Sequence, residues 1–215
     1  MKIISVNVGQ PRELEWKGDI LTTAIHKEPV VGPVAVSKLN LAGDAQADLS
    51  VHGGLSKAVY GYPSEHYAFW CEELPDVDLP WGMFGENLTM AGLTEDEVQI
   101  GDQFRVGTVD LIATEPRMPC SKLNARFGRS DMVKRFLRSG RTGFYFAVAR
   151  EGHLETGNAV EVITRAEHGV TMADVTRLYS TQRDNVPLLR RAIAVEALGE
   201  SWRGYFRHQL EKLEA

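Results

Sequence analysis

Residues 109–120 read VDLIATEPRMPC, an apolar strand pattern that runs directly into a cysteine. Two prolines stiffen the approach to Cys120, and the cations Arg117 and Lys122 flank it. A thiolate, rather than a thiol, is the nucleophilic and metal-binding form of cysteine, and nearby cations favour it. The pattern therefore predicts Cys120 at the end of a rigid strand, as either a functional thiolate or a buried structural cysteine.

Short segments of alternating apolar and polar residues extend this strand pattern in both directions. They lie at residues 3–8, 34–39, 103–106, 143–150 and 159–163. Gly107-Thr108 separates residues 103–106 from 109–113, which is a hairpin signal. Short strands with glycine punctuation are typical of a β-barrel or a β-sandwich. We therefore predict a mainly β fold with a few inserted helices.

Two helical patterns interrupt the predicted strands. The first follows Pro63, a favoured first helical residue, and repeats four residues at helical spacing: Tyr67, Trp70, Cys71 and Leu74. This spacing places Cys71 in the core. The second pattern begins with Ser130 as N-cap and ends at Gly140.

The last quarter of the chain changes to capped helical patterns. Helices are predicted after the capping-box sequence Thr171–Asp174, over Pro187–Leu198, and over Trp202–Leu213 with Ser201 as the cap. We therefore expect two domains, residues 1–163 with the strands and residues 164–215 with three short helices.

Composition and charge narrow the classes of function. The net charge of −5 over 215 residues argues against broad electrostatic binding to nucleic acids or acidic membranes. The two cysteines form neither a disulfide framework nor a CxxC zinc motif. The apolar run in Met1–Gln10 is too short for a signal peptide, and no stretch reaches the ~20 apolar residues of a transmembrane helix. We expect a cytoplasmic protein in a reducing environment that binds neither nucleic acid nor membrane.

Three further groups of residues are candidates for ligand binding. His52-Gly53-Gly54 precedes Lys57, and adjacent glycines let backbone N–H groups approach an anion, although a tight turn would use them equally well. Asn87 lies beside a glycine turn and can bond a heterocycle or the loop backbone. Arg141 can clamp a phosphate or act as a cation at a helix C-terminus.

In their order along the chain, these motifs resemble those of MOSC-domain proteins, most closely the YiiM-like branch. The motifs are Asp48…His52-Gly53-Gly54…Lys57-Ala58-Val59, Phe84-Gly85-Glu86-Asn87-Leu88, Ile100-Gly101-Asp102, Pro116-Arg117-Met118-Pro119-Cys120-Ser121-Lys122-Leu123 and Gly143-Phe144-Tyr145. The resemblance covers essentially the whole sequence. It implies a MOSC β-barrel followed by a small C-terminal three-helix domain, and it implies binding of the molybdenum cofactor, a molybdopterin that carries Mo.

The resemblance also implies roles for individual residues. Cys120 corresponds to the family's metal-ligating cysteine, and a soft thiolate suits Mo. His52 is the candidate proton donor. The cofactor-binding roles fall on Gly53, Gly54, Lys57, Asn87, Arg117, Lys122, Asn124 and Arg141, several of which can bond the terminal phosphate. Glu115 departs from the Gln that is common in this branch, and a carboxylate near an anionic pterin is costly unless it is paired or turned away.

YiiM-like proteins are similar to enzymes that reduce N-hydroxylated compounds such as 6-N-hydroxylaminopurine to amines, so the resemblance implies an oxidoreductase of this kind. The sequence holds no flavin, haem or Fe–S motif, which implies a separate electron-donating reductase as partner. The family also leads us to expect a homodimer. The alternatives are a sulfur-carrier or cofactor-handling module in which Cys120 bears a persulfide, and a binding module that retains only the fold.

Overall fold

The computed structural model describes residues 1–45 and 53–215. Within these residues the main element is an eight-stranded sheet with strand order β12-β8-β9-β10-β6-β7-β1-β4. In chain order its strands are β1 Lys2–Val8, β4 Glu28–Pro29, β6 Val59–Pro63, β7 Leu88–Ala91, β8 Gln103–Val106, β9 Val109–Pro116, β10 Phe144–Arg150 and β12 Val160–Thr164. β6 and β7 pair in parallel and the other neighbours are antiparallel. The predicted mainly β class is confirmed.

The sheet curls towards a barrel without closing along its full length. Lys2, at the start of β1, forms an isolated antiparallel bridge with Ala159, the residue before β12. Val160 N donates to Met1 O at 3.1 Å beside this bridge. The first and last strands of the chain therefore meet at one corner, and the expected barrel is a partly closed one.

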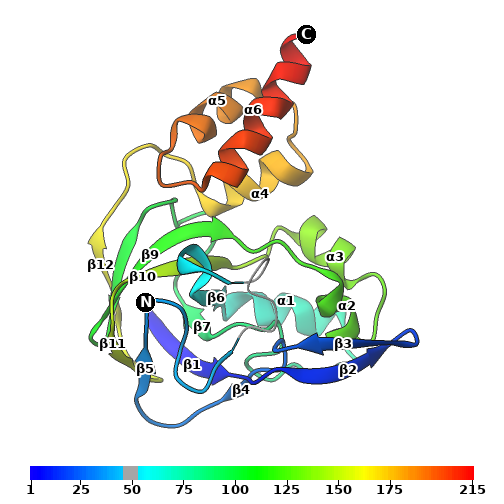
Figure 1. The fold of residues 1–215 in the computed structure, drawn as a ribbon, viewed down its shortest axis with the longest axis vertical. Helices are drawn as coiled ribbons and strands as arrows, with labels where there is room; N and C mark the ends of the chain where they lie inside the picture. Colours follow the sequence, from blue (N-terminus) through cyan, green and yellow to red (C-terminus); the bar gives the residue numbers. More distant parts are fainter. Residues whose placement is uncertain (46–52) are drawn as a thin grey trace.

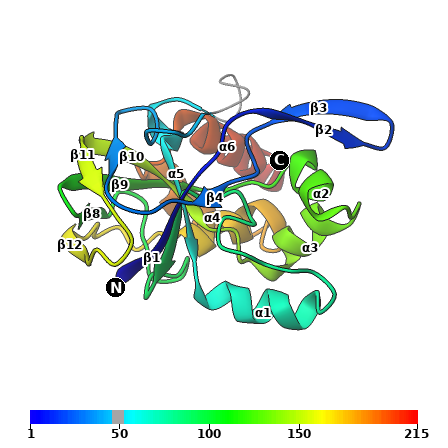
Figure 2. The ribbon, with the colours of Figure 1, turned by 90° about the horizontal axis from the view of Figure 1, so that it is seen from below.

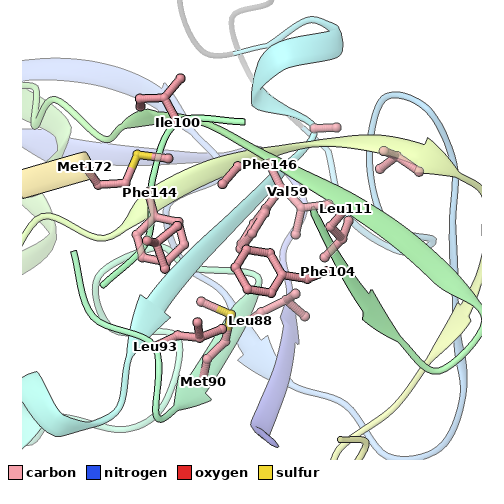
Figure 3. Packing of buried hydrophobic residues seen from close by; sticks show 14 of the residues in the cluster. Val59, Leu88, Met90, Leu93, Ile100, Phe104, Leu111, Phe144, Phe146 and Met172 are labelled. Atoms are coloured by element: carbon pink, nitrogen blue, oxygen red, sulfur yellow. The ribbon is translucent and has the colours of Figure 1, made fainter. Parts of the chain in front are cut away.

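Aromatic side chains fill the inside of the curled sheet (Figure 3). Phe104 of β8 and Phe146 of β10 pack edge to face with ring centroids 6.1 Å apart, and Phe144 lies 5.2 Å from Phe146. All three are fully buried, and each buried side chain of this kind contributes about 1.5–3 kcal/mol. This packing holds β8, β9 and β10 together, so the loop that follows β9 starts from a rigid edge.

Helices are inserted between the strands, and the α-helices among them lie together beside the sheet (Figure 1). They are the 3-10 helix η1 Leu55–Lys57 and the α-helices α1 Glu65–Glu73, α2 Ser121–Phe127 and α3 Met132–Ser139. A helix follows Pro63 as predicted, although Pro63 itself ends β6 and Ser64 is the N-cap of α1. Asp131 rather than Ser130 is the N-cap of α3, which ends at Gly140 as predicted. The sequence does not predict α2, because its seven residues are too few for a clear period.

The predicted burial of Cys71 is wrong. Its side chain is exposed on α1, whereas Tyr67 and Trp70 are buried. Successive residues point about 100° apart around a helix, and His66 rather than Cys71 completes the buried face of α1. His66 tolerates burial because its Nε2 lies 2.7 Å from Glu95 Oε2.

Three helices gather at one end of the molecule and carry the C-terminus (Figure 1). They are α4 Met172–Ser180, α5 Val186–Ala194 and α6 Glu200–Glu214. The predicted capping box is confirmed, since Thr171 Oγ1 accepts from Asp174 N and Asp174 Oδ2 accepts from Thr171 N, each at 3.1 Å. Ser201 is not a cap, because α6 begins one residue earlier with Gly199 as its N-cap.

The helical segment shares a buried cluster with the sheet (Figure 3). Met172 N donates to Val98 O at 2.9 Å, and Ile100 N donates to Val170 O at 3.1 Å. Met172 and Ile100 are fully buried in that cluster. Buried residues on both sides of the junction therefore belong to one cluster. The division into residues 1–163 and 164–215 stays a prediction.

Two two-stranded sheets lie outside the main sheet in the described residues. β2 Arg12–Trp16 and β3 Asp19–Thr23 form a hairpin that projects from the molecule (Figure 2) and that the sequence does not predict. β5 Val34–Val36 pairs with β11 Gly152–Leu154, and β5 is shorter than the predicted strand. In the described parts of the chain, every helix is too short or too polar to cross a membrane.

Candidate functional site

Cys120 lies where β9 ends and α2 begins. It is the extended N-cap residue of α2, with φ −120° and ψ 176°. Arg117 N donates to Gly143 O at 3.1 Å, and Leu123 N donates to Cys120 O at 2.9 Å, so the backbone is anchored on both sides of the thiol. The predicted place of Cys120 at the end of a strand is confirmed, and its side chain is half-buried.

Two neighbouring cavities border Cys120. The first has a volume of about 90 Å³, and we call it the basic cavity; its lining includes Lys27, Lys57, Asn87, Arg117, Lys122 and Tyr145. The second has a volume of about 390 Å³, and we call it the aromatic cavity; its lining includes Lys57, Glu115, Met118, Tyr145, Tyr179 and Trp202. Lys57, Cys120 and Tyr145 border both, so the thiol lies where the two cavities meet.

Among residues 1–45 and 53–215, four cations and one carboxylate line the basic cavity. The cations are Lys27, Lys57, Arg117 and Lys122, and the carboxylate is Asp44. Arg117 is buried, its guanidinium lies 4.9 Å from the centroid of the Tyr60 ring, and its Nη1 has no hydrogen-bond partner among residues 1–45 and 53–215. A buried charged donor without a partner is costly, so this wall suits an anionic ligand.

Lys27 and Asp44 form a buried ion pair in the same wall. Burial lowers the pKa of Lys27, and the Asp44 carboxylate opposes that shift. Asp44 also accepts hydrogen bonds from Gly9 N at 2.9 Å and from Asn87 Nδ2 at 2.8 Å. With these bonds to both carboxylate oxygens, the pair forms a rigid part of the cavity wall.

Asn87 supports the wall through its whole amide group. Its Oδ1 accepts from Tyr60 N at 3.1 Å, and its Nδ2 donates to Asp44 and to Asn7 O at 3.3 Å. Both amide donors are therefore used within the protein. Asn87 lines the basic cavity, but these bonds make it a support for Asp44 and β6.

The other predicted site residues divide into two groups. Gly53 and Gly54 lie at the start of η1, and Lys57 at its end reaches both cavities. Asn124 and Arg141 lie elsewhere: Asn124 Oδ1 accepts from Val133 N at 2.9 Å, and the Arg141 guanidinium lies 4.0 Å over the Phe69 ring. Neither side chain is part of the described lining of the two cavities. His52 lies outside the described residues.

The sequence gives little sign of Lys27, Asp44 or Trp202 as site residues. A buried lysine needs an acidic partner, but Asp44 is 17 residues away, so no local motif joins them. Trp202 Nε1 donates to Glu115 Oε2 at 2.5 Å across 87 residues. This bond answers the question raised by Glu115: its carboxylate is paired with Trp202 and lies 3.6 Å from Lys57 Nζ.

The donor set fits a ligand that carries both a phosphate and a thiophilic metal. The basic cavity has the volume of about three waters, which is room for a phosphate-sized group among its cations. Cys120 adds a soft sulfur donor at the border of that cavity. Within the described part of the chain the Nη1 of Arg117 has no hydrogen-bond partner, and this buried donor favours an anion in the cavity.

Comparisons with known proteins agree with this architecture. A model of the MOSC domain matches residues 48–161, and a model of the YiiM-like 3-alpha helix domain matches residues 170–213. YflK of Bacillus subtilis is 41% identical over 98% of this chain and 95% of its own length. A protein named reductase from Gibberella moniliformis is 34% identical over 87% of this chain but only 34% of its own length. The crystal structure of YiiM from Geobacillus stearothermophilus superposes with a TM-score of 0.81 at 35% identity, covering 97% of this chain and 98% of that one.

Proposed function

Because the chain belongs to the MOSC-domain family, in the branch with a YiiM-like three-helix domain, we propose that it is an oxidoreductase that binds the molybdenum cofactor and reduces N-hydroxylated compounds to amines. The observation that carries the proposal is the position of Cys120 on the border of a small cavity lined by four cations. The name of the Gibberella relative, a reductase, supports the same class of reaction.

The residues of the basic cavity have separate tasks in this proposal. Arg117 and Lys122 would hold the terminal phosphate of the cofactor through charge-assisted hydrogen bonds, and Cys120 would offer its thiolate to the metal. Lys27 and Asp44 keep the wall in place. When bound, the cofactor supplies the two-electron redox chemistry.

The overall reaction sets what the rest of the site must provide. Conversion of R–NH–OH to R–NH₂ and water consumes two electrons and two protons. We propose that the electrons come from a separate reductase, since the sequence carries no flavin, haem or Fe–S motif. His52 stays the predicted proton donor, because histidine exchanges protons near neutral pH.

The test is metal and pterin analysis of protein purified from a host that makes the cofactor, followed by reduction of 6-N-hydroxylaminopurine with a reduced viologen dye. We expect stoichiometric Mo and pterin, and turnover. Lys122→Glu should lower the retained Mo, whereas Lys134→Glu, the same charge change at an exposed position on α3, should not. Cyanide-labile sulfur without Mo would instead support a sulfur carrier with a Cys120 persulfide.

A further inference from the structure

We propose that the aromatic cavity is the substrate site, in which a planar N-hydroxylated base stacks on Tyr179 of α4. The proposal deepens the proposed function and rests on it for the class of substrate. It assigns a binding role to the three-helix segment, which supplies Tyr179 and Trp202 to a cavity that borders Cys120.

The dimensions and lining of the aromatic cavity suit a flat organic molecule. Its volume of about 390 Å³ lies within the usual range of ligand pockets. Met118, Tyr179 and Trp202 supply apolar surface, and Glu115 and Lys57 supply polar groups that can bond the edge of a heterocycle. This mixture of apolar walls and a few polar groups is typical of small-molecule sites.

The two rings of this wall are held in place before any ligand arrives. Trp202 is buried and its Nε1–H is bonded to Glu115 Oε2. The Tyr179 and Trp202 rings meet nearly edge to face, with centroids 5.7 Å apart. Tyr179 is only half-buried and lines the cavity. A fixed ring beside an open space is a ready surface for stacking.

The two cavities differ in the charge of their linings, and this difference indicates which ligand binds in each. The basic cavity has four cations and one carboxylate, which favours the phosphate of the cofactor. In the described lining of the aromatic cavity the charged residues are Glu115 and Lys57, so this lining has no such excess of positive charge. A neutral base therefore fits the aromatic cavity better than an anion does, and both ligands would approach Cys120 from different sides.

The test measures binding apart from turnover. Equilibrium dialysis of the full chain, prepared without the cofactor, against 6-N-hydroxylaminopurine should show saturable binding. Loss of a stacked ring weakens base binding by between about 5-fold and 100-fold, so we expect this increase in Kd for Tyr179→Ala. Tyr179→Phe keeps the ring and should bind as wild type does. Trp16→Ala removes a partly exposed ring of the β2–β3 hairpin that is absent from the described lining of both cavities, and it is the matched control.

In the cofactor-loaded enzyme, Tyr179→Ala should raise KM with little change in kcat. If the base binds and Tyr179→Ala weakens that binding while no reduction is detected, the inference stands and the proposed function fails. If reduction proceeds but Tyr179→Ala leaves both Kd and KM unchanged, the inference is overturned. Absence of saturable binding, or equal losses in Tyr179→Ala and Trp16→Ala, would also overturn it.

Discussion

Cys120 and Cys71 show how much the surroundings decide for one residue type. Neither is in a disulfide, but Cys120 borders both cavities, whereas Cys71 is exposed on α1. The difference arises from the backbone: Cys120 is fixed between a strand and a helix, and Cys71 lies on the outer face of a helix.

Cys120→Ser should abolish the reduction of N-hydroxylated bases while leaving the fold nearly intact. A hydroxyl is a poor replacement for a thiolate at a soft metal, and the small change in volume should cost far less than the ~2–5 kcal/mol of a core truncation. Cys71→Ser is the matched control and should retain full activity. Activity is compared at equal Mo occupancy; full turnover by Cys120→Ser would show that the thiolate is not required.

His26 should make the stability depend on pH. Burial, together with the guanidinium of Arg126, lowers the pKa of His26 from 6.5 to about 4. Arg126 Nη1 donates to His26 Nδ1 at 2.5 Å, which needs a neutral ring. Between pH 6.5 and about 4 the unfolded chain binds more protons at this residue, so the free energy of unfolding falls as the pH drops.

His26→Gln should remove this contribution, which we place at about 1–2 kcal/mol because the ring is partly exposed. Urea unfolding of wild type and variant across that pH range gives the difference. The variant should lose less stability on acidification than the wild type, and parallel curves would contradict the assignment.

At the scale of elements, the turn between α3 and β10 positions Arg117. Gly143 has φ +61°, and its carbonyl accepts the Arg117 N–H at 3.1 Å. A Cβ at Gly143 would lie 2.5 Å from Gly61 O in β6. The packing of β6 against β10 thus depends on the absence of a side chain here.

Gly143→Ala should therefore destabilise the protein by more than ~2 kcal/mol, because a left-handed backbone conformation and a backbone clash add together. Gly128→Ala is the control: Gly128 caps α2 at φ +63° with no atom near its added Cβ, so only about 1 kcal/mol is expected. Thermal unfolding of both variants gives the comparison. Equal losses would show that the clash is relieved by a small shift of β6.

At the scale of the whole molecule, the sheet and the helical segment share a core. The start of α4 is bonded to the loop before β8, and Trp202 of α6 is bonded to Glu115 of β9. The aromatic cavity exists only because these two parts of the chain pack together.

We therefore expect one cooperative unfolding transition for the full chain. Met172→Ala, at a fully buried position of that core, should lower its stability by about 2–5 kcal/mol. Leu213→Ala, at a position on α6 that is 46% exposed, should change it by less than ~0.5 kcal/mol. Circular dichroism and tryptophan fluorescence should coincide. Two transitions, of which Met172→Ala shifts one, would show that the helical segment unfolds by itself.

The sequence by itself determined the features that depend on near neighbours. The alternation in residues 103–106 and 109–113 predicts β8 and most of β9, and it places Cys120 after a strand. The Thr171–Asp174 pattern predicts the capping box. Ordered motifs along the whole chain also identify the family. Periodicity and capping depend on residues a few positions apart, so they can be recognised from the amino-acid sequence alone.

Only the tertiary structure decided which distant residues meet. Lys27 is paired with Asp44, and Glu115 is bonded to Trp202. The guanidinium of Arg141 lies over the Phe69 ring and not in the described lining of either cavity. The tertiary structure also turns Cys71 outward, because His66 occupies the buried face of α1. Such contacts join segments tens of residues apart, and they depend on how the sheet curls and where the helices pack, which no local pattern encodes.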